Sequence, residues 1–172
     1  LTRIGRGAWK GHVLRPCVTG TRPSSSRLRE AVFSILGSDL SGAVFWDLFC
    51  GTGAMGLEAL SCGAVFSVFV DSSQAALDGI GRFLASRGSL EKGRLERRRL
   101  PADLASLPGP ADAVFLDPPY RLSGIYSWIE SIRWSGLVSK GAMIMAESGS
   151  PDSLPGWEKR RYGSTWLFIW RG

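Results

Sequence analysis

Short apolar runs typical of buried strands alternate with stretches of helical periodicity from residue 43 onward, and this alternation constrains the fold more than any other feature. The sequence predicts strands over residues 43–49, 65–70, 94–100, 113–116 and 142–146, and helices over residues 54–61, 74–86 and 126–134. Strands that alternate with helices form a mostly parallel sheet covered on both faces. The segments 157–162 and 165–170 are expected to pair about Gly163-Ser164 as a closing hairpin. The predicted fold class is α/β.

The residues before this alternation form two shorter units. Residues 1–20 hold short apolar pieces separated by glycines and basic residues, which is typical of a small hairpin. Residues 24–36 carry apolar side chains at helical spacing after Pro23, and the three serines that open this segment are candidate caps. A chain of 172 residues fits one domain with its own core. We therefore expect a hairpin extension over residues 1–20 followed by one main domain over residues 21–172.

The tetrapeptide Asp117-Pro118-Pro119-Tyr120 follows the predicted strand 113–116, so it lies at the carboxyl end of that strand. Ligands bind at this edge in open α/β sheets. Two consecutive prolines stiffen the loop and remove two N–H donors, so the Asp117 carboxylate and the Pro118 carbonyl are placed to accept both hydrogens of a planar amine. The Tyr120 ring offers a flat surface on which a base can stack. The pattern predicts a site for an aromatic amine; the alternative is a rigid strand-to-helix turn.

A glycine-rich turn joins the predicted strand 43–49 to the helix 54–61. Gly51 and Gly53 allow a tight turn and the close approach of a ligand to the backbone. Asp71 ends the next strand, 20 residues beyond Gly51, where an acidic residue binds ribose hydroxyls in dinucleotide-binding folds. The spacing alone leaves two alternatives open, a nicotinamide dinucleotide site and a purely structural turn.

Two features favour an adenosyl ligand with an amino-acid tail over a dinucleotide. Asp47 stands just before the turn, where a carboxylate can receive an ammonium group. The chain has a single histidine, His12, and no second domain for hydride chemistry. Asp103, after the strand 94–100, is placed to reach an adenine amino group, although it suits a helix cap or a loop charge equally well.

Most of the net charge of +6 lies in the first quarter of the chain. Residues 1–40 hold seven basic side chains against Glu30 and Asp39, a net of +5, whereas the other 132 residues hold 14 basic and 13 acidic groups. The seven basic residues are Arg3, Arg6, Lys10, Arg15, Arg22, Arg27 and Arg29. A localised basic segment is the electrostatic pattern expected for nucleic acid binding. The alternative is a solvated tail that aids solubility.

Other features argue against several classes of protein. Three cysteines without CxxC spacing argue against a disulfide framework and a zinc site, and they favour a reducing cytoplasm. A single histidine excludes multi-histidine metal sites. No apolar run reaches the roughly 18 residues of a membrane span, and the basic N-terminus lacks the apolar stretch of a secretory signal. We therefore expect a cytoplasmic protein without a metal or a membrane partner, and a monomer by default.

Five stretches of the chain together carry a family resemblance. They are Arg3-Ile4-Gly5 with Trp9-Lys10-Gly11, Arg22-Pro23-Ser24 with Arg29-Glu30-Ala31-Val32-Phe33, Asp47 to Gly53 with Gly56-Leu57-Glu58-Ala59-Leu60, Phe115 to Tyr120, and Tyr162-Gly163-Ser164-Thr165. In these the chain resembles the bacterial 16S rRNA guanine-N2 methyltransferases of the RsmD type, members of the class I S-adenosylmethionine-dependent superfamily. The resemblance spans almost the whole chain. It implies a Rossmann-like, mostly parallel seven-stranded sheet with helices on both faces and a small N-terminal β-hairpin.

The resemblance also implies roles for the candidate residues. The S-adenosylmethionine site that it implies consists of Asp47, Phe49, Gly51, Gly53, Asp71, Ser72 and Asp103. Asp117, Pro118, Pro119 and Tyr120 would receive the target base. The residues that would contact RNA are Arg3, Arg6, Lys10, Arg22, Arg27 and Arg29. Asp71 stands where the family commonly has Glu, so its ribose contact is expected to be looser or bridged by water.

The reaction that the resemblance implies is direct transfer of a methyl group to the exocyclic N2 amine of a guanine in small-subunit ribosomal RNA, either free or in an assembling particle. It needs no metal and no covalent enzyme intermediate. Two other hypotheses stay open. The first is a DNA adenine-N6 or cytosine-N4 methyltransferase, because the same acceptor pair handles any of these amines. The second is an inactive module that holds RNA or cofactor without turnover, against which the intact glycine turn and carboxylates argue.

Overall fold

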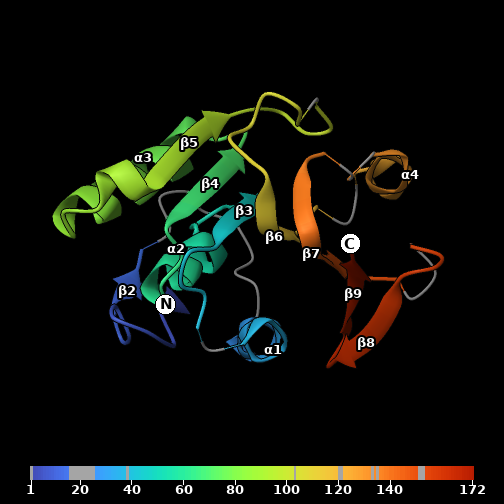
Figure 1. The fold of residues 1–172 in the computed structure, drawn as a ribbon, viewed down its shortest axis with the longest axis horizontal. Helices are drawn as coiled ribbons and strands as arrows, with labels where there is room; N and C mark the ends of the chain where they lie inside the picture. The colour runs from blue at the N-terminus through green and yellow to red at the C-terminus, as the bar shows by residue number, and fades with distance from the viewer. Residues whose placement is uncertain are drawn as a thin grey trace.

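A seven-stranded sheet runs through the computed structural model, which describes residues 2–15, 26–37, 39–102, 104–119, 122–132, 134, 136–150 and 154–172 (Figure 1). The strands in chain order are β3 (Val44–Leu48), β4 (Phe66–Asp71), β5 (Gly93–Arg97), β6 (Ala111–Leu116), β7 (Val138–Ser148), β8 (Glu158–Tyr162) and β9 (Thr165–Arg171). Their order across the sheet is β5-β4-β3-β6-β7-β9-β8. Of these seven, β9 runs antiparallel to its neighbours and the other pairs are parallel. The expected mostly parallel seven-stranded sheet is therefore confirmed.

Helices cover both faces of the sheet. They are α1 (Ser26–Leu36), α2 (Ala54–Ser61), α3 (Gln74–Ser86) and α4 (Ile125–Ser131), and a short 3-10 helix, Leu90–Lys92, precedes β5. The first three pack on one face and α4 packs on the other (Figure 1). Successive side chains of a strand point to opposite faces, so Phe45 of β3 lies in the core under α1 whereas Trp46 lies in the core under α4. Burial on both faces explains why these strands form continuous apolar runs in the sequence.

Most strands lie within one or two residues of their predicted bounds, whereas β7 and β5 differ more, and the helix predicted over residues 126–134 is α4, which ends already at Ser131. β7 is longer than the predicted strand 142–146, because its first four residues are exposed or half-exposed and give no apolar run. β5 ends at Arg97 rather than at residue 100, because its neighbour β4 ends at Asp71 and can pair no further. The helices predicted over residues 54–61 and 74–86 are confirmed at their predicted bounds.

The predicted N-terminal hairpin is confirmed by the antiparallel pair β1 (Thr2–Arg3) and β2 (Val13–Leu14). The turn between these strands packs on the end of α2. There the N–H of Ala8 donates to the carbonyl of Ser61 at 2.8 Å, and the N–H of Trp9 donates to the Ser61 hydroxyl at 2.8 Å. The hairpin is therefore attached to the helix that follows the glycine turn.

The helix predicted over residues 24–36 is described from Ser26 onward as α1. Of the apolar residues at helical spacing, Leu28 and Val32 are fully buried and Ile35 and Leu36 are half-buried, while Phe33 is fully buried in addition. Residues 16–25, which include the other two candidate caps, lie outside the described residues.

Candidate functional site

The two loops that the sequence singled out lie at one edge of the sheet. β3 pairs in register with both of its neighbours, so that Leu48 lies opposite Val70 of β4 and opposite Leu116 of β6. The N–H of Asp117 donates to the carbonyl of Leu48 at 3.3 Å. The glycine turn after β3 and the proline loop after β6 therefore start side by side, at the edge where ligands bind in such sheets.

Asp47 of β3 is a buried carboxylate at this edge, with 2% of its surface exposed. Its Oδ2 accepts a hydrogen bond from the N–H of Gly56 at 2.9 Å. Since α2 follows Gly53, which has no side chain to cap the helix, Asp47 satisfies an N–H of the first turn. Burial raises the pKa of Asp47 well above its usual value, although the Gly56 hydrogen bond opposes this; the charges of Asp117 and Asp71 raise it further. A cation beside Asp47 would therefore compensate a costly buried charge.

Asp71 ends β4 and is held by two backbone N–H groups. Gly51 donates to its Oδ2 at 2.8 Å, and Ser73 donates to its Oδ1 at 2.8 Å. The Ser73 hydroxyl in turn caps α3. Each carboxylate oxygen has lone pairs for further donors, so Asp71 is an oriented acceptor, with the exposed Ser72 next to it. Asp103, predicted to reach an adenine, lies outside the described residues.

The turn after β3 has an unusual backbone. Phe49 has a φ of 62°. Among the described residues that are not glycine, it alone has a positive φ. Such conformations cost on the order of 1–3 kcal/mol and cluster at ligand sites. A Cβ on Gly53 would lie 2.7 Å from Ile80, so the glycine allows α3 to pack against the turn. A Cβ on Gly51 would meet no described atom within 4 Å, so the backbone there is open to a ligand.

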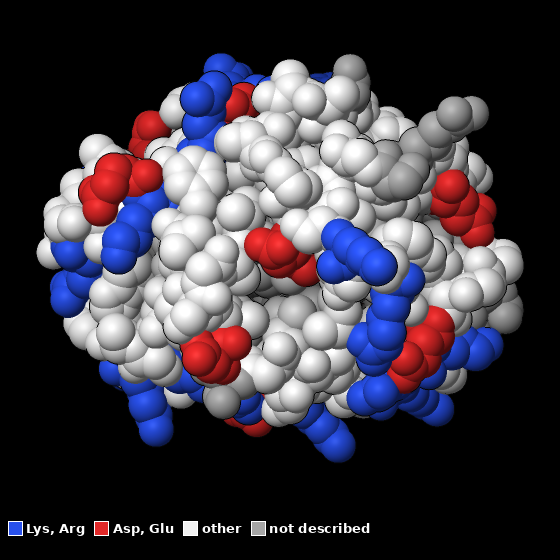
Figure 2. Space-filling model, in the orientation of Figure 1, with Lys and Arg blue, Asp and Glu red and all other residues white. Residues whose placement is uncertain are grey.

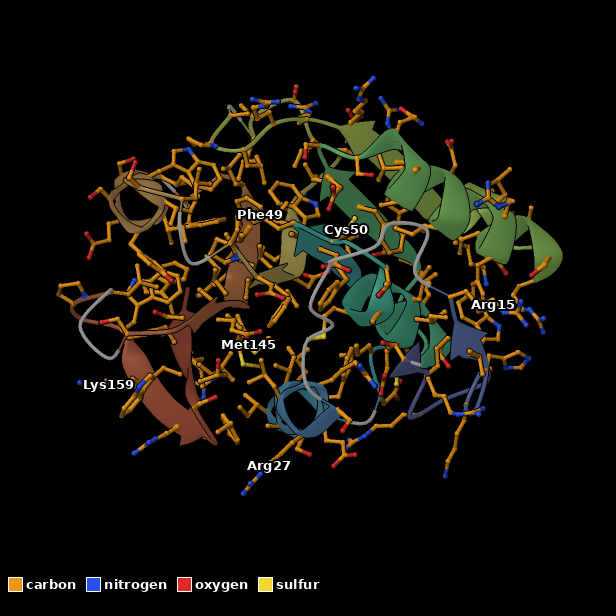
Figure 3. The ribbon with its side chains drawn as sticks, turned by 180° about the vertical axis from the view of Figure 1, so that it is seen from behind. Arg15, Arg27, Phe49, Cys50, Met145 and Lys159 are labelled. Atoms are coloured by element: carbon orange, nitrogen blue, oxygen red, sulfur yellow. The ribbon has the colours of Figure 1, made fainter. Side chains whose placement is uncertain are left out.

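A cavity of about 420 Å³ lies beside this turn. Its lining comes from β2 and the residue after it, the glycine turn, the end of β4 and α3, and includes Leu14, Arg15, Gly51, Thr52, Asp71, Ser73, Ile80 and Phe83. Figure 3 shows Arg15 beside β2, with Phe49 and Cys50 at the end of β3. The cavity therefore connects two predicted cofactor residues, Gly51 and Asp71, to the N-terminal hairpin.

The proline loop after β6 leads directly towards α4. Asp117 is half-buried, Pro118 is buried and Pro119 is exposed. The carbonyl of Pro119 accepts a hydrogen bond from the N–H of Leu122 at 2.9 Å, which bends the chain towards the helix. Tyr120 lies outside the described residues, so its role as a stacking platform stays a prediction.

Five of the predicted RNA-binding residues lie on the hairpin and on α1, and four of these are exposed or half-exposed. Arg3, Lys10 and Arg27 are exposed, and the half-exposed Arg6 donates from Nη2 to the hydroxyl of Ser34 at 3.0 Å. Figure 2 shows Lys and Arg mostly along the periphery of one face, with acidic side chains between them. The positive charge of the hairpin is therefore one part of a wider, mixed surface.

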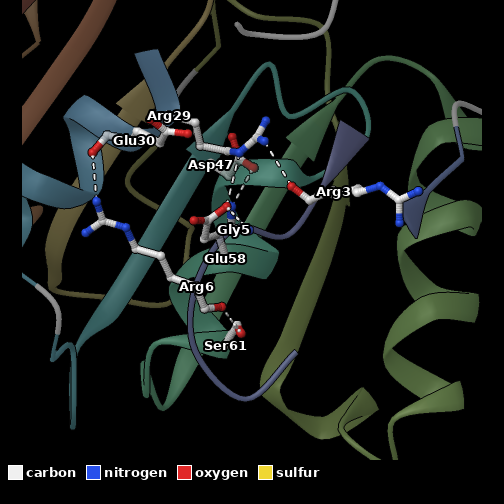
Figure 4. Close-up of polar contacts among 9 residues, drawn as sticks. Arg3, Gly5, Arg6, Arg29, Glu30, Asp47, Glu58 and Ser61 are labelled. Carbon is white, nitrogen blue, oxygen red and sulfur yellow. Dashed lines mark hydrogen bonds and ion pairs between the residues drawn. The ribbon is translucent and has the colours of Figure 1, made fainter. Parts of the chain in front are cut away.

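Arg29 is buried, which corrects the prediction that it contacts RNA. Its Nε donates to Oε2 of Glu58 at 3.1 Å, with 8% and 1% of the two side chains exposed. Its Nη2 donates to the carbonyl of Arg3 at 2.9 Å, and Glu58 also accepts from the N–H of Gly5 at 3.1 Å (Figure 4). This ion pair joins α1, α2 and the hairpin, so Arg29 is a structural residue. Arg22 lies outside the described residues.

Two buried acidic side chains were missed by the sequence analysis. Glu58 of α2 is 1% exposed and Glu147 of β7 is 7% exposed. The hydroxyl of Thr165 donates to Oε1 of Glu147 at 3.0 Å. Glu58 is the only charged residue in the apolar run 54–61, and Glu147 is the only one in the run 142–148. An isolated charge in an apolar run indicates a buried charge, which needs a partner or a function. This signal would have identified both residues from the sequence.

Other reactive groups are scarce in the described part of the chain. No group of three His, Cys, Asp or Glu side chains there is placed to hold a metal ion. Burial raises the pKa of the Cys50 thiol well above its usual value, so the thiol is protonated and unreactive at neutral pH. What the site offers is oriented acceptors and an open backbone turn, which suit positioning of a ligand.

The helices of the described residues include none with the length and apolar character needed to cross a membrane.

Comparison with known proteins identifies relatives along nearly the whole chain. The model of a family described as "Conserved hypothetical protein 95" matches residues 2–171. The ribosomal RNA small subunit methyltransferase D of Escherichia coli K12 is 33% identical over 156 residues, which cover 89% of this chain and 77% of that protein.

Solved structures show the same fold. A hypothetical protein of Thermus thermophilus superimposes with a TM-score of 0.81 at 27% identity, covering 98% of each chain. An RNA methyltransferase of Salinibacter ruber, solved in complex with S-adenosyl-L-homocysteine, gives a TM-score of 0.64 at 15% identity over 87% of this chain and 93% of that chain. The sheet order and these neighbours confirm the predicted class I methyltransferase fold.

Proposed function

This chain belongs to the family of the ribosomal RNA small subunit methyltransferase D, and we propose that it transfers a methyl group from S-adenosylmethionine to the exocyclic N2 amine of a guanine in small-subunit ribosomal RNA. The observation that carries the proposal is the register of β3 with β4 and β6, which brings the glycine turn and the Asp117-Pro118 loop to one edge. One loop suits the methyl donor, and its neighbour suits the amine.

The described residues fit this cofactor, which supplies a methyl group on a positively charged sulfur and therefore already activated. The buried carboxylate of Asp47 suits an ammonium group, because the cation would compensate its charge. The open backbone at Gly51 allows close approach, and the oriented carboxylate of Asp71 suits ribose hydroxyls, with Ser72 beside it. The proposed contact of Asp103 with the adenine rests on the family resemblance.

The proline loop supplies the acceptors for the amine. The lone pair of this nitrogen is delocalised into the guanine ring, so the amine is a poor nucleophile. The Asp117 carboxylate and the Pro118 carbonyl would accept its two hydrogens and turn the lone pair towards the methyl group. Orientation of this kind can contribute on the order of 7–11 kcal/mol to a bimolecular reaction. The proton that the product amine releases would pass to Asp117 or to water.

The RNA would contact both the proline loop and the basic residues of the hairpin and α1. The target guanine must leave its stack at a cost of a few kcal/mol, which stacking on Tyr120 would partly offset. The exposed side chains of Arg3, Lys10 and Arg27 and the half-exposed Arg6 would bind phosphates of the RNA segments that flank the extruded base. The proposed active unit is a monomer, because one chain supplies all of these groups, and its substrate places it in the cytoplasm.

The experiment that tests the proposal is transfer of a labelled methyl group to unmethylated small-subunit RNA and to partly assembled small subunits, with DNA as the control. Nucleoside analysis is expected to find N2-methylguanosine. Adenine-N6 or cytosine-N4 methylation of DNA would overturn the proposed substrate. Binding of the cofactor without transfer to any nucleic acid would identify an inactive module instead.

A further inference from the structure

Glu147, near the end of β7, lies at the same edge as Asp117. β6 and β7 are parallel neighbours, and Leu116 opposite Ala146 is the last pair in their register. Asp117 and Glu147 each follow this pair by one residue, on strands that lie about 4.8 Å apart. Two carboxylates from adjacent strands are therefore neighbours at the carboxyl edge.

Both side chains belong to the face of the sheet that α1 and α2 cover. Side chains alternate along a strand, and Phe115 and Met145, each two residues earlier, lie in the core on that face. β6 ends at Leu116, but the N–H of Asp117 still donates to the carbonyl of Leu48 at 3.3 Å, and the charge of Asp117 acts on Asp47, which lies on the same face as Phe45. Asp117 and Glu147 therefore share one face as well as one edge.

Glu147 is a buried and oriented carboxylate. It is 7% exposed, and Thr165, the first residue of β9, donates to its Oε1 at 3.0 Å. This bond holds the side chain between β7 and the β8–β9 turn. Each carboxylate oxygen has about two lone pairs, so Glu147 can accept more than the bond from Thr165. A neutral glutamine would accept that bond equally well and would cost less to bury.

We propose that Glu147 selects guanine by accepting a hydrogen bond from the N1–H of the target base, while Asp117 and Pro118 hold the N2 amine. The inference rests on the function proposed above. N1–H and the N2 amine are adjacent donors on the Watson–Crick edge of guanine, and the two strands present adjacent acceptors. Adenine N1 and cytosine N3 are acceptors, so either base would place a lone pair against the carboxylate of Glu147. Glu147 and Asp117 together would therefore bind guanine and disfavour adenine and cytosine.

The test compares the wild type with Glu147→Gln, which keeps the size of the side chain and the acceptor for Thr165 but adds an N–H donor in place of the charge. The two substrates are small-subunit RNA with guanine at the methylated position, once that position is located, and the same RNA with a single ligated 2-aminopurine there. 2-Aminopurine keeps the amine but presents a lone pair at N1. We expect the wild type to prefer guanine in kcat/KM by about tenfold or more, and the variant to lose this preference.

Two further variants separate recognition from structure. Thr165→Val removes the hydrogen bond to Glu147 but leaves the carboxylate, so it should keep the guanine preference. Glu147→Asp keeps the charge on a shorter side chain, so it should lower turnover of the guanine substrate without reversing the preference. All variants should bind S-adenosyl-L-homocysteine as the wild type does.

The outcomes distinguish this inference from the proposed function. A wild type that methylates guanine N2 while Glu147→Gln shows an unchanged preference would overturn the role of Glu147 alone. If the Glu147→Gln variant does not fold, wild-type rates of Glu147→Asp on both substrates would equally overturn the proposed role of Glu147. A wild type that methylates no RNA, or a different amine, would remove the proposed function itself.

Discussion

The carboxylate of Asp47, on β3, accepts a hydrogen bond from the backbone N–H of Gly56, on α2, at a distance of 2.9 Å. A strand residue thus caps the helix that follows. The N-cap residue of this helix is Gly53, which has no side chain that could do so. The same carboxylate is buried at the ligand edge of the sheet and lies near the charges of Asp71 and Asp117. One residue therefore links the shape of the glycine turn to the electrostatics of the proposed site.

Replacing Asp47 with Asn is expected to weaken cofactor binding and to leave the fold in place. The amide oxygen of Asn still accepts from Gly56, but the charge that would attract the ammonium group is lost. A hydrogen bond to a charged group contributes about 1.5–3 kcal/mol, so the Kd for S-adenosyl-L-homocysteine in calorimetry should rise by about 10- to 100-fold. Asp47→Leu, which removes the cap as well, should in addition lower the free energy of unfolding. Equal affinities for wild type and Asp47→Asn would contradict the assignment.

Asp47 should contribute a part of the free energy of unfolding without cofactor that falls as the pH rises. Burial raises the pKa of Asp47 in the folded state well above its usual value, so the folded state binds this proton more tightly than the unfolded state. The stability that this proton adds is fully present below the pKa that Asp47 has in the unfolded state. It is lost as the pH rises through the pKa of Asp47 in the folded state. Urea unfolding across a pH series measures it. In Asp47→Asn this component of the pH dependence should disappear, and its persistence would assign it to another group.

Replacing Asp117 with Ala should abolish most methyl transfer without affecting cofactor binding. The amine would lose one of its two acceptors, and loss of one oriented polar group in a catalytic site typically costs about 10²-fold or more in kcat. Single-turnover transfer to small-subunit RNA and calorimetry with S-adenosyl-L-homocysteine measure the two quantities. The control is Asp78→Ala, which removes an exposed carboxylate of α3 that bonds to Gln74 at 2.8 Å. Lost cofactor binding in a folded Asp117→Ala protein would contradict the proposed role.

Arg29 and Arg27 should respond in opposite ways to replacement by Met, although they are two residues apart. Arg29→Met leaves Glu58 buried and unpaired, so the free energy of unfolding should fall by about 3–5 kcal/mol, while RNA affinity of the folded protein should not change. Arg27→Met removes an exposed charge, so it should change stability by less than about 0.5 kcal/mol but weaken RNA binding. Denaturant unfolding measures the stability of the two variants, and titration with RNA measures their RNA affinity.

A second replacement tests the ion pair itself. Combining Arg29→Met with Glu58→Leu removes both charges, so most of the lost stability should return. A double variant that is as unstable as the single one would show that packing, and not the unpaired charge, causes the loss.

Neutralising the hairpin should weaken RNA binding in a salt-dependent way. In a variant with Gln at Arg3, Arg6 and Lys10, the slope of log K against log salt should decrease by about 0.7 for each lost phosphate contact with single-stranded RNA. The matched control replaces three exposed arginines at or just after β5, Arg94, Arg97 and Arg99. If both variants keep the wild-type slope, the hairpin is a solubility element and not an RNA contact.

Local patterns in the chain were sufficient to predict most of the fold. Helical spacing located α2 and α3 at their observed bounds, and apolar runs located the strands, because both signals come from burial within one element. The exposed start of β7 carries no such signal, so its length depends on pairing with β6. The motif spacing also predicted that the turn at Gly51 and the loop at Asp117 belong to one edge, and the register confirms this.

The amino-acid pattern alone was therefore enough to predict the α/β fold and to locate the two edge loops. Three-dimensional packing was needed to show that Arg29 is buried against Glu58, that Asp47 caps α2, and that Asp117 and Glu147 both follow the last register pair of β6 and β7. The physical reason is that each of these relationships joins two different elements, and most of them join residues about 30 positions apart in the sequence. Charge and spacing describe what one segment can do, but burial and partner choice depend on which other segments pack against it.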